Sequence, residues 1–117
     1  MRPHKKLEAW KEAMRLTSSI YECVGQFPDS EKFGLISQMK RASISIPSNI
    51  AEGAARQTKK EFKQFLFIAR GSLSELDTQL ELSLNLKLIT KDSFDEILEK
   101  IDKVNAMLNG LLKSITP

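Results

Sequence analysis

The sequence has very few of the residues on which catalysis and metal binding depend. Its 117 residues include one cysteine, Cys23, and one histidine, His4. A single cysteine excludes a disulfide within the chain and gives no sign of a secreted, disulfide-rich fold. A single histidine excludes the paired Glu-x-x-His motifs of di-iron bundles. Gly-rich phosphate loops, Ser-His-Asp sets and nucleophile elbows are also missing. We therefore expect no enzymatic activity, no metal and no cofactor.

Long apolar runs are missing as well. No stretch approaches the roughly 20 residues that span a bilayer, and the opening MRPHKKLEAWKEAM is charged where a signal peptide would be apolar. We therefore expect a cytoplasmic protein with no membrane partner. Charged residues make up 28% of the sequence, hydrophobic residues 41%, and the formal net charge is +3. This profile is ordinary for a single folded domain covering residues 1–117.

What the sequence has in abundance is helical periodicity. Apolar residues recur every three or four positions over about residues 6–26, 35–53 and 59–86, and again from residue 91 onwards. In the first segment this stripe includes Trp10, Met14 and Tyr21. Thr58 and Glu61 form a capping box before the third segment. Four amphipathic segments with short breaks predict an all-α fold, an antiparallel up-down-up-down bundle of four long helices.

The second segment contains a proline, in the stretch RASISIPSNIAEG. Residues 42–46 alternate like a strand, but the helical spacing continues on both sides, and a lone strand has no partner. A proline inside a helix costs about 3 kcal/mol and removes one hydrogen bond. We predict a helix kinked at Pro47, with Pro47 and Ile44 facing outward and Asn49 inward. Ser43 or Ser45 would satisfy the backbone groups that the proline frees.

Four residues of this region are predicted to have structural roles: Pro47, Asn49, Glu52 and Gly53. The Asn49 amide is expected to fix the helix register or to bond the backbone near Pro47, and ligand contact is the alternative. Glu52 has three candidate partners, which are Arg41, Arg56 and a residue across an interface.

Basic residues are predicted to gather at one end of such a bundle. The start of the first helix, the junction of the second and third, and the end of the fourth contribute Arg2, Lys5, Lys6, Arg56, Lys59, Lys60, Lys63 and Lys113. We predict that a nucleic-acid backbone, RNA or DNA, is contacted by Lys5, Lys6, Arg56, Lys59, Lys60 and Lys63. The alternative is a solvated helix end. Base stacking is not expected, because Trp10 and Tyr21 fall on the core stripe.

Apolar residues outside the core stripes suggest self-assembly. A predicted oligomer interface consists of Ile44, Phe67, Ile68 and Arg70. The small residues Ala69, Gly71, Ser72 and Ser74 would allow another helix to approach closely. Two roles are open for Arg41 and Arg70: an ion pair with another subunit, or contact with a polyanion. A competing hypothesis is a structural adaptor whose oligomer binds only protein partners.

Two stretches, FGLISQMKRASISIPSNIAEG and EFKQFLFIARGSLSELDTQL, resemble the four-helix-bundle proteins encoded in intervening sequences of bacterial 23S ribosomal RNA genes. The opening LEAWKEAM resembles the first helix of that family. The same superfamily looks to include the accessory protein of diversity-generating retroelements. This resemblance implies an antiparallel bundle that assembles into a ring, a homopentamer, without enzymatic activity. For the retroelement relatives it implies binding of nucleic acid and of a reverse transcriptase.

Overall fold

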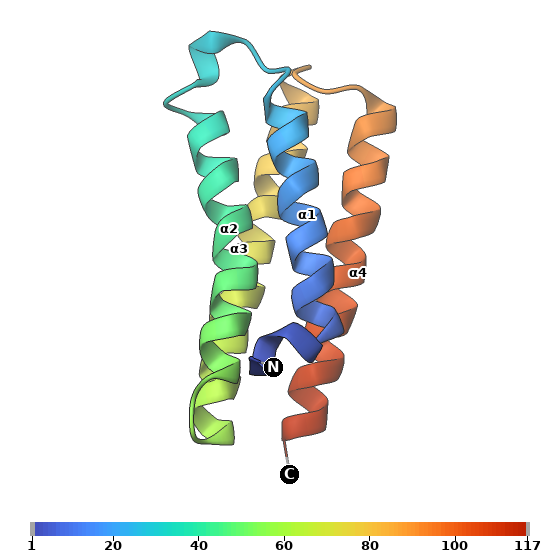
Figure 1. Cartoon of the computed structure of the whole chain (residues 1–117). Helices are drawn as coiled ribbons and strands as arrows, with labels where there is room; N and C mark the ends of the chain where they lie inside the picture. The colour runs from blue at the N-terminus through green and yellow to red at the C-terminus, as the bar shows by residue number, and fades with distance from the viewer. Residues whose placement is uncertain (1, 117) are drawn as a thin grey trace.

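Four long helices carry most of the chain in the computed structural model, which describes residues 2–116 (Figure 1). They are α1 (Glu8–Val24), α2 (Leu35–Ala54), α3 (Lys59–Asn85) and α4 (Lys91–Ile115). Two short 3-10 helices, η1 (Pro3–Lys6) and η2 (Asp29–Glu31), precede α1 and α2. No strand occurs among the described residues. The prediction of an all-α fold is confirmed.

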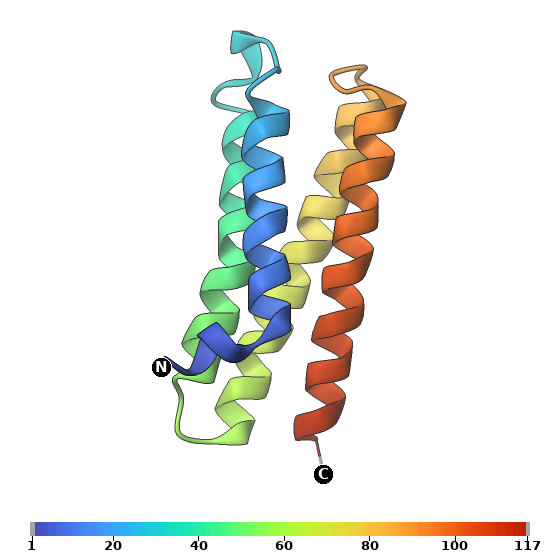
Figure 2. The ribbon, with the colours of Figure 1, turned by 45° about the vertical axis from the view of Figure 1, so that its right-hand side comes forward.

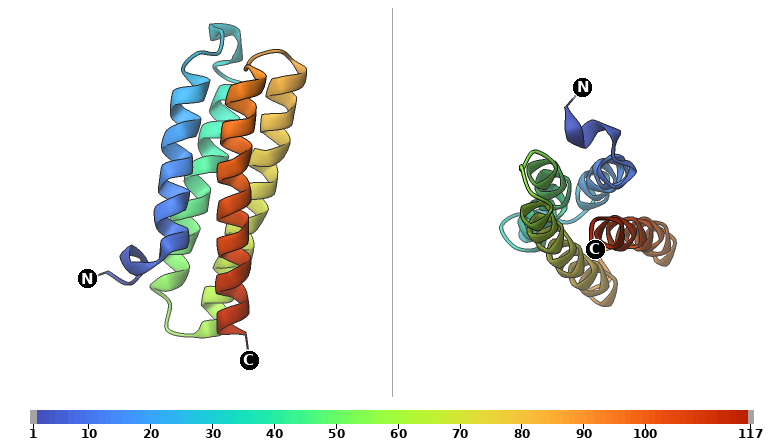
Figure 3. Two further views of the ribbon diagram at one scale, coloured as in Figure 1. Left: turned by 90° about the vertical axis from the view of Figure 1, so that its right-hand side faces the viewer. Right: turned by 90° about the horizontal axis from the view of Figure 1, so that it is seen from below.

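The four helices lie along a common long axis, and the molecule measures 44 × 23 × 22 Å (Figures 1 and 2). α1 contacts α2 and α4, and α3 contacts the same two helices. The connections 25–34 and 86–90 lie at one end, which we call the far end (Figure 3). The connection 55–58 lies at the opposite end together with both chain ends. We call this the terminal end.

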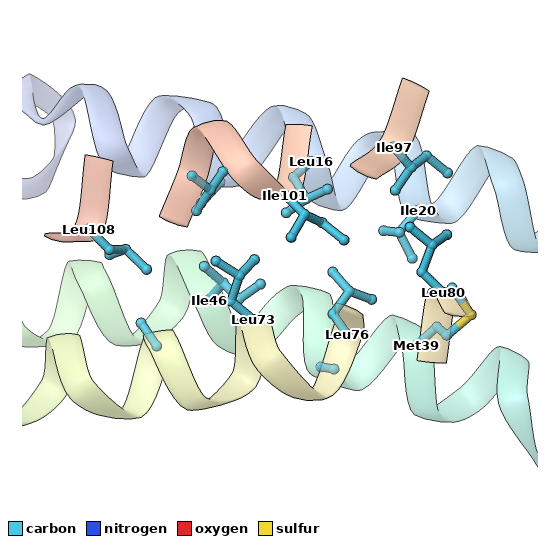
Figure 4. Close-up of a cluster of buried hydrophobic side chains, with 14 of the residues drawn as sticks. Leu16, Ile20, Met39, Ile46, Leu73, Leu76, Leu80, Ile97, Ile101 and Leu108 are labelled. Atoms are coloured by element: carbon cyan, nitrogen blue, oxygen red, sulfur yellow. The ribbon is translucent and has the colours of Figure 1, made fainter. Parts of the chain in front are cut away.

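A stripe of aliphatic side chains from every helix fills the centre (Figure 4). The buried face of α1 consists of Ala9, Ala13, Leu16, Ile20 and Val24. The predicted stripe was therefore wrong at Met14 and Tyr21, whose exposed fractions are 45% and 41%. In a four-helix bundle each helix buries only the narrow strip of its surface that faces the other helices. Met14 and Tyr21 lie at the margins of that strip on α1. The ammonium group of Lys40 sits 4.9 Å from the centre of the Tyr21 ring.

The ends of α3 and α4 are set by side-chain caps. Thr58 accepts a hydrogen bond from the Glu61 amide at 3.1 Å, which places the start of α3 at the predicted cap. The Glu61 carboxylate accepts from the Thr58 hydroxyl at 2.9 Å and completes the pair through the side chain. Thr90 caps α4 in the same way, through the amide of Ser93.

Pro47 lies inside α2 and is buried, so the prediction that it faces outward was wrong. A proline has no amide hydrogen, and the carbonyl of Ser43, four residues earlier, loses its helical partner. The Thr17 hydroxyl of α1 lies 2.9 Å from that carbonyl. It also lies 3.0 Å from the carbonyl of Ala13, so its single proton serves both oxygens or one at a time. The orphaned group is therefore satisfied from the neighbouring helix, which explains why this face of α2 turns inward.

Neither of the serines predicted to compensate for the proline does so. Ser43 bonds back to the carbonyl of Lys40. The hydroxyl of Ser45 lies 2.8 Å from that of Ser72 on α3. The half-buried Asn49 amide donates to both the carbonyl and the hydroxyl of Ser45, at 2.8 and 2.9 Å. Asn49 thus belongs to a polar contact that joins α2 to α3.

Gly53 marks the closest approach of α2 and α3. A Cβ atom at this position would lie 2.8 Å from the Cβ of Phe65 and 2.9 Å from Cδ1 of Phe62. Only glycine leaves room for these rings, so the structural role predicted for Gly53 is a steric one. Ser72 serves the same contact, and Ala69 is fully buried. The helix that comes close at Ser72 is α2 of the same chain, and Ala69 is covered within the subunit.

Candidate nucleic-acid interface

The terminal end collects the predicted basic residues because η1 folds against α2. Pro3 opens η1, and the half-buried Leu7 after it packs against the core. This anchor holds η1, with Lys5 and Lys6, against α1 and α2. Lys63 is half-buried, and the remaining basic residues of this end are exposed: Arg2, Lys5, Lys6, Arg56, Lys59, Lys60 and Lys113.

Most of these charges have no acidic partner within the described residues. Arg56 is the exception, since its Nη2 lies 3.0 Å from Oε1 of Glu52 and its guanidinium sits 4.7 Å from the centre of the Phe65 ring. Of the two partners within the chain that were considered for Glu52, it pairs with Arg56 and not with Arg41. Glu8 is already paired with Lys11 at 3.1 Å. A surface with many free cations and locally engaged acids attracts polyanions.

The far end has the opposite character. Asp29, Asp92, Asp95 and Glu96 are exposed there. Lys91 contacts Asp95 and Lys100 contacts Glu96, within the same helix. A cavity of about 320 Å³ between α1 and the start of α4 is lined by Glu22, Glu96 and Cys23, among others. Burial raises the pKa of the Cys23 thiol, which keeps it protonated and unreactive near neutral pH.

One groove contains residues from both predicted sites, the nucleic-acid contact and the oligomer interface. Phe67 and Arg70, predicted at an oligomer interface, share a groove with Lys63, predicted to bind nucleic acid. This groove lies between the first half of α3 and the end of α4. Nη1 of Arg70 donates to Oδ1 of Asn109 at 2.9 Å and so ties the two helices together. The guanidinium carbon of Arg70 lies 4.9 Å from the centre of the Phe67 ring.

Ile44 lies elsewhere, on the outer face of α2. Its exposed fraction is 43%, and it lines a separate shallow groove with Phe33, Ile36 and Arg41. Ile68 of α3 is 52% exposed. Ile44 and Phe67 line two separate grooves. Phe67 and Ile68 lie next to each other on α3, and Ile44 lies on α2.

One sequence signal for the groove between α3 and α4 was missed. Residues 62–74 contain Lys63 and Arg70 but no acidic residue, and residues 103–116 contain Lys103 and Lys113 and again none. Helix pairs on protein surfaces usually mix both signs of charge. Two acid-free helical segments of this length were a usable sign that each carries a basic surface.

Within residues 2–116 no three side chains of His, Cys, Asp or Glu converge in a way that would hold a metal ion. None of the described helices has the length and apolar character needed to cross a membrane.

The fold is similar to that of a solved bacterial protein. The chain superposes with a TM-score of 0.80 on the crystal structure of a protein of unknown function from the S23 ribosomal protein family of Bacteroides thetaiotaomicron. The two sequences are 24% identical, and the match covers 90% of this chain and 98% of the other. None of the curated proteins compared with the chain matches it.

The sequence comparison extends over most of the helical region. Residues 5–110 match the family described as 23S rRNA-intervening sequence protein. This range includes all of α1, α2 and α3 and most of α4. The basic residues of η1 and the α2–α3 connection fall within it, and Lys113 lies just beyond it. The chain belongs to the 23S rRNA-intervening sequence protein family.

Proposed function

We propose that this protein is a non-enzymatic, cytoplasmic binder of the nucleic-acid backbone, RNA or DNA, which acts through its terminal end. In this proposal the chain is an antiparallel up-down-up-down bundle with α2 kinked at Pro47, and it assembles into a homo-oligomeric ring of five subunits. A ring would present the terminal end once per subunit, so weak contacts would add up to strong binding.

The observation that carries the proposal is the set of unpaired cations at the terminal end. Lys5, Lys6, Lys59 and Lys60 are exposed, and no acidic group of the described residues pairs with them. Each cation that meets a phosphate releases counterions, which makes binding favourable and steeply dependent on salt. Arg56 is expected to contribute less because Glu52 already neutralises part of its charge.

The test compares two double variants with the same change in charge. Lys59→Gln with Lys60→Gln removes two cations from the terminal end. Lys32→Gln with Lys87→Gln removes two exposed cations from the far end. Binding to a labelled RNA and to a DNA duplex is measured by fluorescence anisotropy across a salt series. The terminal-end variant should make the negative slope of log K against log salt shallower by about 2, and the far-end control should leave it unchanged.

The proposal fails if the wild-type protein binds neither RNA nor duplex DNA at micromolar concentration and low salt. It also fails if the two variants lose the same affinity, because binding would then follow net charge rather than position.

A second candidate function is a protein-binding adaptor, and the exposed apolar face of α2 favours it. Ile44, Ile36 and Phe33 line one groove there, which Lys32, Lys40 and Arg41 also line. A partner helix or another subunit with acidic residues around an apolar face would gain by covering it. A reverse transcriptase is one such candidate partner, by the resemblance to retroelement accessory proteins. This alternative predicts that Ile44→Asp abolishes the association in pull-down and sedimentation experiments. Neutralising Lys59 and Lys60 would then have no effect.

A further inference from the structure

The groove between α3 and α4 combines an exposed aromatic ring with three cations. Lys63 and Arg70 enter it from α3 and Lys113 from α4, and Phe67 is 43% exposed between the two residues of its own helix. Within residues 2–116, none of these three cations forms an ion pair. The groove encloses about 540 Å³, which is within the size range of sites for small ligands, about 300–1,000 Å³.

Two of the cations, Arg70 and Lys63, lie close to the Phe67 ring. Arg70 donates to Asn109 at 2.9 Å, and its guanidinium carbon lies 4.9 Å from the centre of the Phe67 ring. The ammonium of Lys63 is 6.0 Å from the same ring, at the outer limit of a cation–π contact. The half-buried Lys63 forms no ion pair within residues 2–116, so its ammonium is available to an anion.

The chemistry of the groove selects its occupant. Three unpaired cations demand negative charge, because covering them with an apolar helix would leave them buried without partners. An aromatic face beside them accepts a flat ring, and base–aromatic stacking is the usual means by which proteins hold unpaired nucleotides. In a duplex the bases are stacked inside and cannot reach Phe67.

We propose that this groove is a binding site for single-stranded nucleic acid, with an unpaired base stacked on Phe67 and the adjoining phosphates held by Lys63, Arg70 and Lys113. It rests on the proposed function, and it narrows that function from any nucleic-acid backbone to strands with unpaired bases. It also reassigns Phe67 and Arg70 from subunit contact to ligand contact.

The test uses the full-length protein, a labelled 20-nucleotide RNA without secondary structure, and a labelled 20-base-pair duplex. Phe67→Ala removes the stacking surface. The matched control is Phe33→Ala at the far end, where an even more exposed phenylalanine also lies under a lysine. We expect Phe67→Ala to weaken single-strand binding by about fivefold or more, and to leave duplex binding unchanged. Phe33→Ala should change neither, and Phe67→Trp should restore or tighten single-strand binding because its ring stacks better.

The outcomes separate this proposal from the one on which it rests. If the wild type binds both oligonucleotides and Phe67→Ala changes neither, the groove assignment is overturned while the proposed function stands. If the wild type binds neither, both are overturned. If Phe67→Ala changes the sedimentation coefficient of the assembly, the groove is a contact between copies and the assignment fails. It also fails if a polyglutamate peptide of equal charge displaces the single strand as well as unlabelled RNA does.

Discussion

The first half of α3 has two different neighbours, and its contact with each is built in a different way. Towards α2 the contact is closed, with Gly53 against two phenylalanine side chains and the hydroxyls of Ser45 and Ser72 2.8 Å apart. Towards α4 the contact is open, with a groove lined by cations and bridged by the bond from Arg70 to Asn109. One helix therefore has a sealed side and an accessible side within the same few turns.

The difference shows that side-chain size and charge, rather than helix position, decide whether two helices close on each other. Glycine and serine allow the backbones of α2 and α3 to approach, and their polar atoms bond to one another. Long cationic side chains repel one another and stay hydrated, so the edges of α3 and α4 remain apart. Stability is expected to depend on the sealed side and ligand binding on the open side.

The largest effect is expected at Gly53. Gly53→Val places atoms within 3 Å of Phe65 and Phe62 and should lower the free energy of unfolding by about 3 kcal/mol or more, since the two helices cannot move apart without exposing the core. Urea denaturation followed by circular dichroism measures this loss. Gly110→Val on α4 is the control, because no atom lies within 4 Å of a Cβ there. Equal losses for the two variants would show that the α2–α3 contact is not sealed.

The next largest effect concerns the hydrogen bond that compensates for Pro47. Thr17→Val keeps the side-chain shape but leaves the buried Ser43 carbonyl without a donor, and it should cost about 2 kcal/mol. Pro47→Ala restores the helical donor, so Thr17→Val should cost at least about 1 kcal/mol less in that background. A thermal-melt double-mutant cycle measures the coupling. Strictly additive effects would mean that Thr17 does not serve the carbonyl freed by the proline.

A gain in stability is expected at Gly71, on the exposed part of α3. A Cβ there has no atom within 4 Å, and alanine favours the helix by about 1 kcal/mol over glycine. Gly71→Ala should therefore raise the urea midpoint. If the variant instead dissociates the oligomer in sedimentation experiments, the small side chain is covered by another subunit.

The smallest effect is expected at Asn109, on the open side. Asn109→Ala removes one hydrogen bond between exposed groups that water can replace, and should change the free energy of unfolding by no more than about 0.5 kcal/mol. The same urea titration measures it, beside Thr17→Val. A loss as large as that of Thr17→Val would show that the α3–α4 contact depends on this bond. It would contradict the expectation that stability depends on the side of α3 that faces α2.

The helices and most of their buried faces could be predicted, because periodicity and caps are local properties. The cap at Thr58 and the buried seam of α4 from Phe94 to Leu108 were in the pattern. The orientation of Pro47 could not be predicted from the sequence, because the donor for the Ser43 carbonyl comes from 26 residues earlier in the chain. Met14 and Tyr21 were misplaced since apolar character alone does not tell the centre of a stripe from its margin.

The candidate site was predictable in its residues but not in their grouping. The six predicted cations were read from the ends of helices, and the structure places them at the terminal end as expected. The groove depends on how α3 and α4 pack, and Arg70 and Asn109 are 39 residues apart. A contact over that distance leaves no trace in the spacing of either helix alone.

Because the Ser43 carbonyl depends on Thr17, the middle of α2 gains its full set of hydrogen bonds only when α1 lies beside it. During translation α1 leaves the ribosome before α2, so the donor is already present when Pro47 emerges. A circular permutant that places α1 last would reverse this order. In that permutant the Ser43 carbonyl of α2 would lack its donor until α1 had been synthesised.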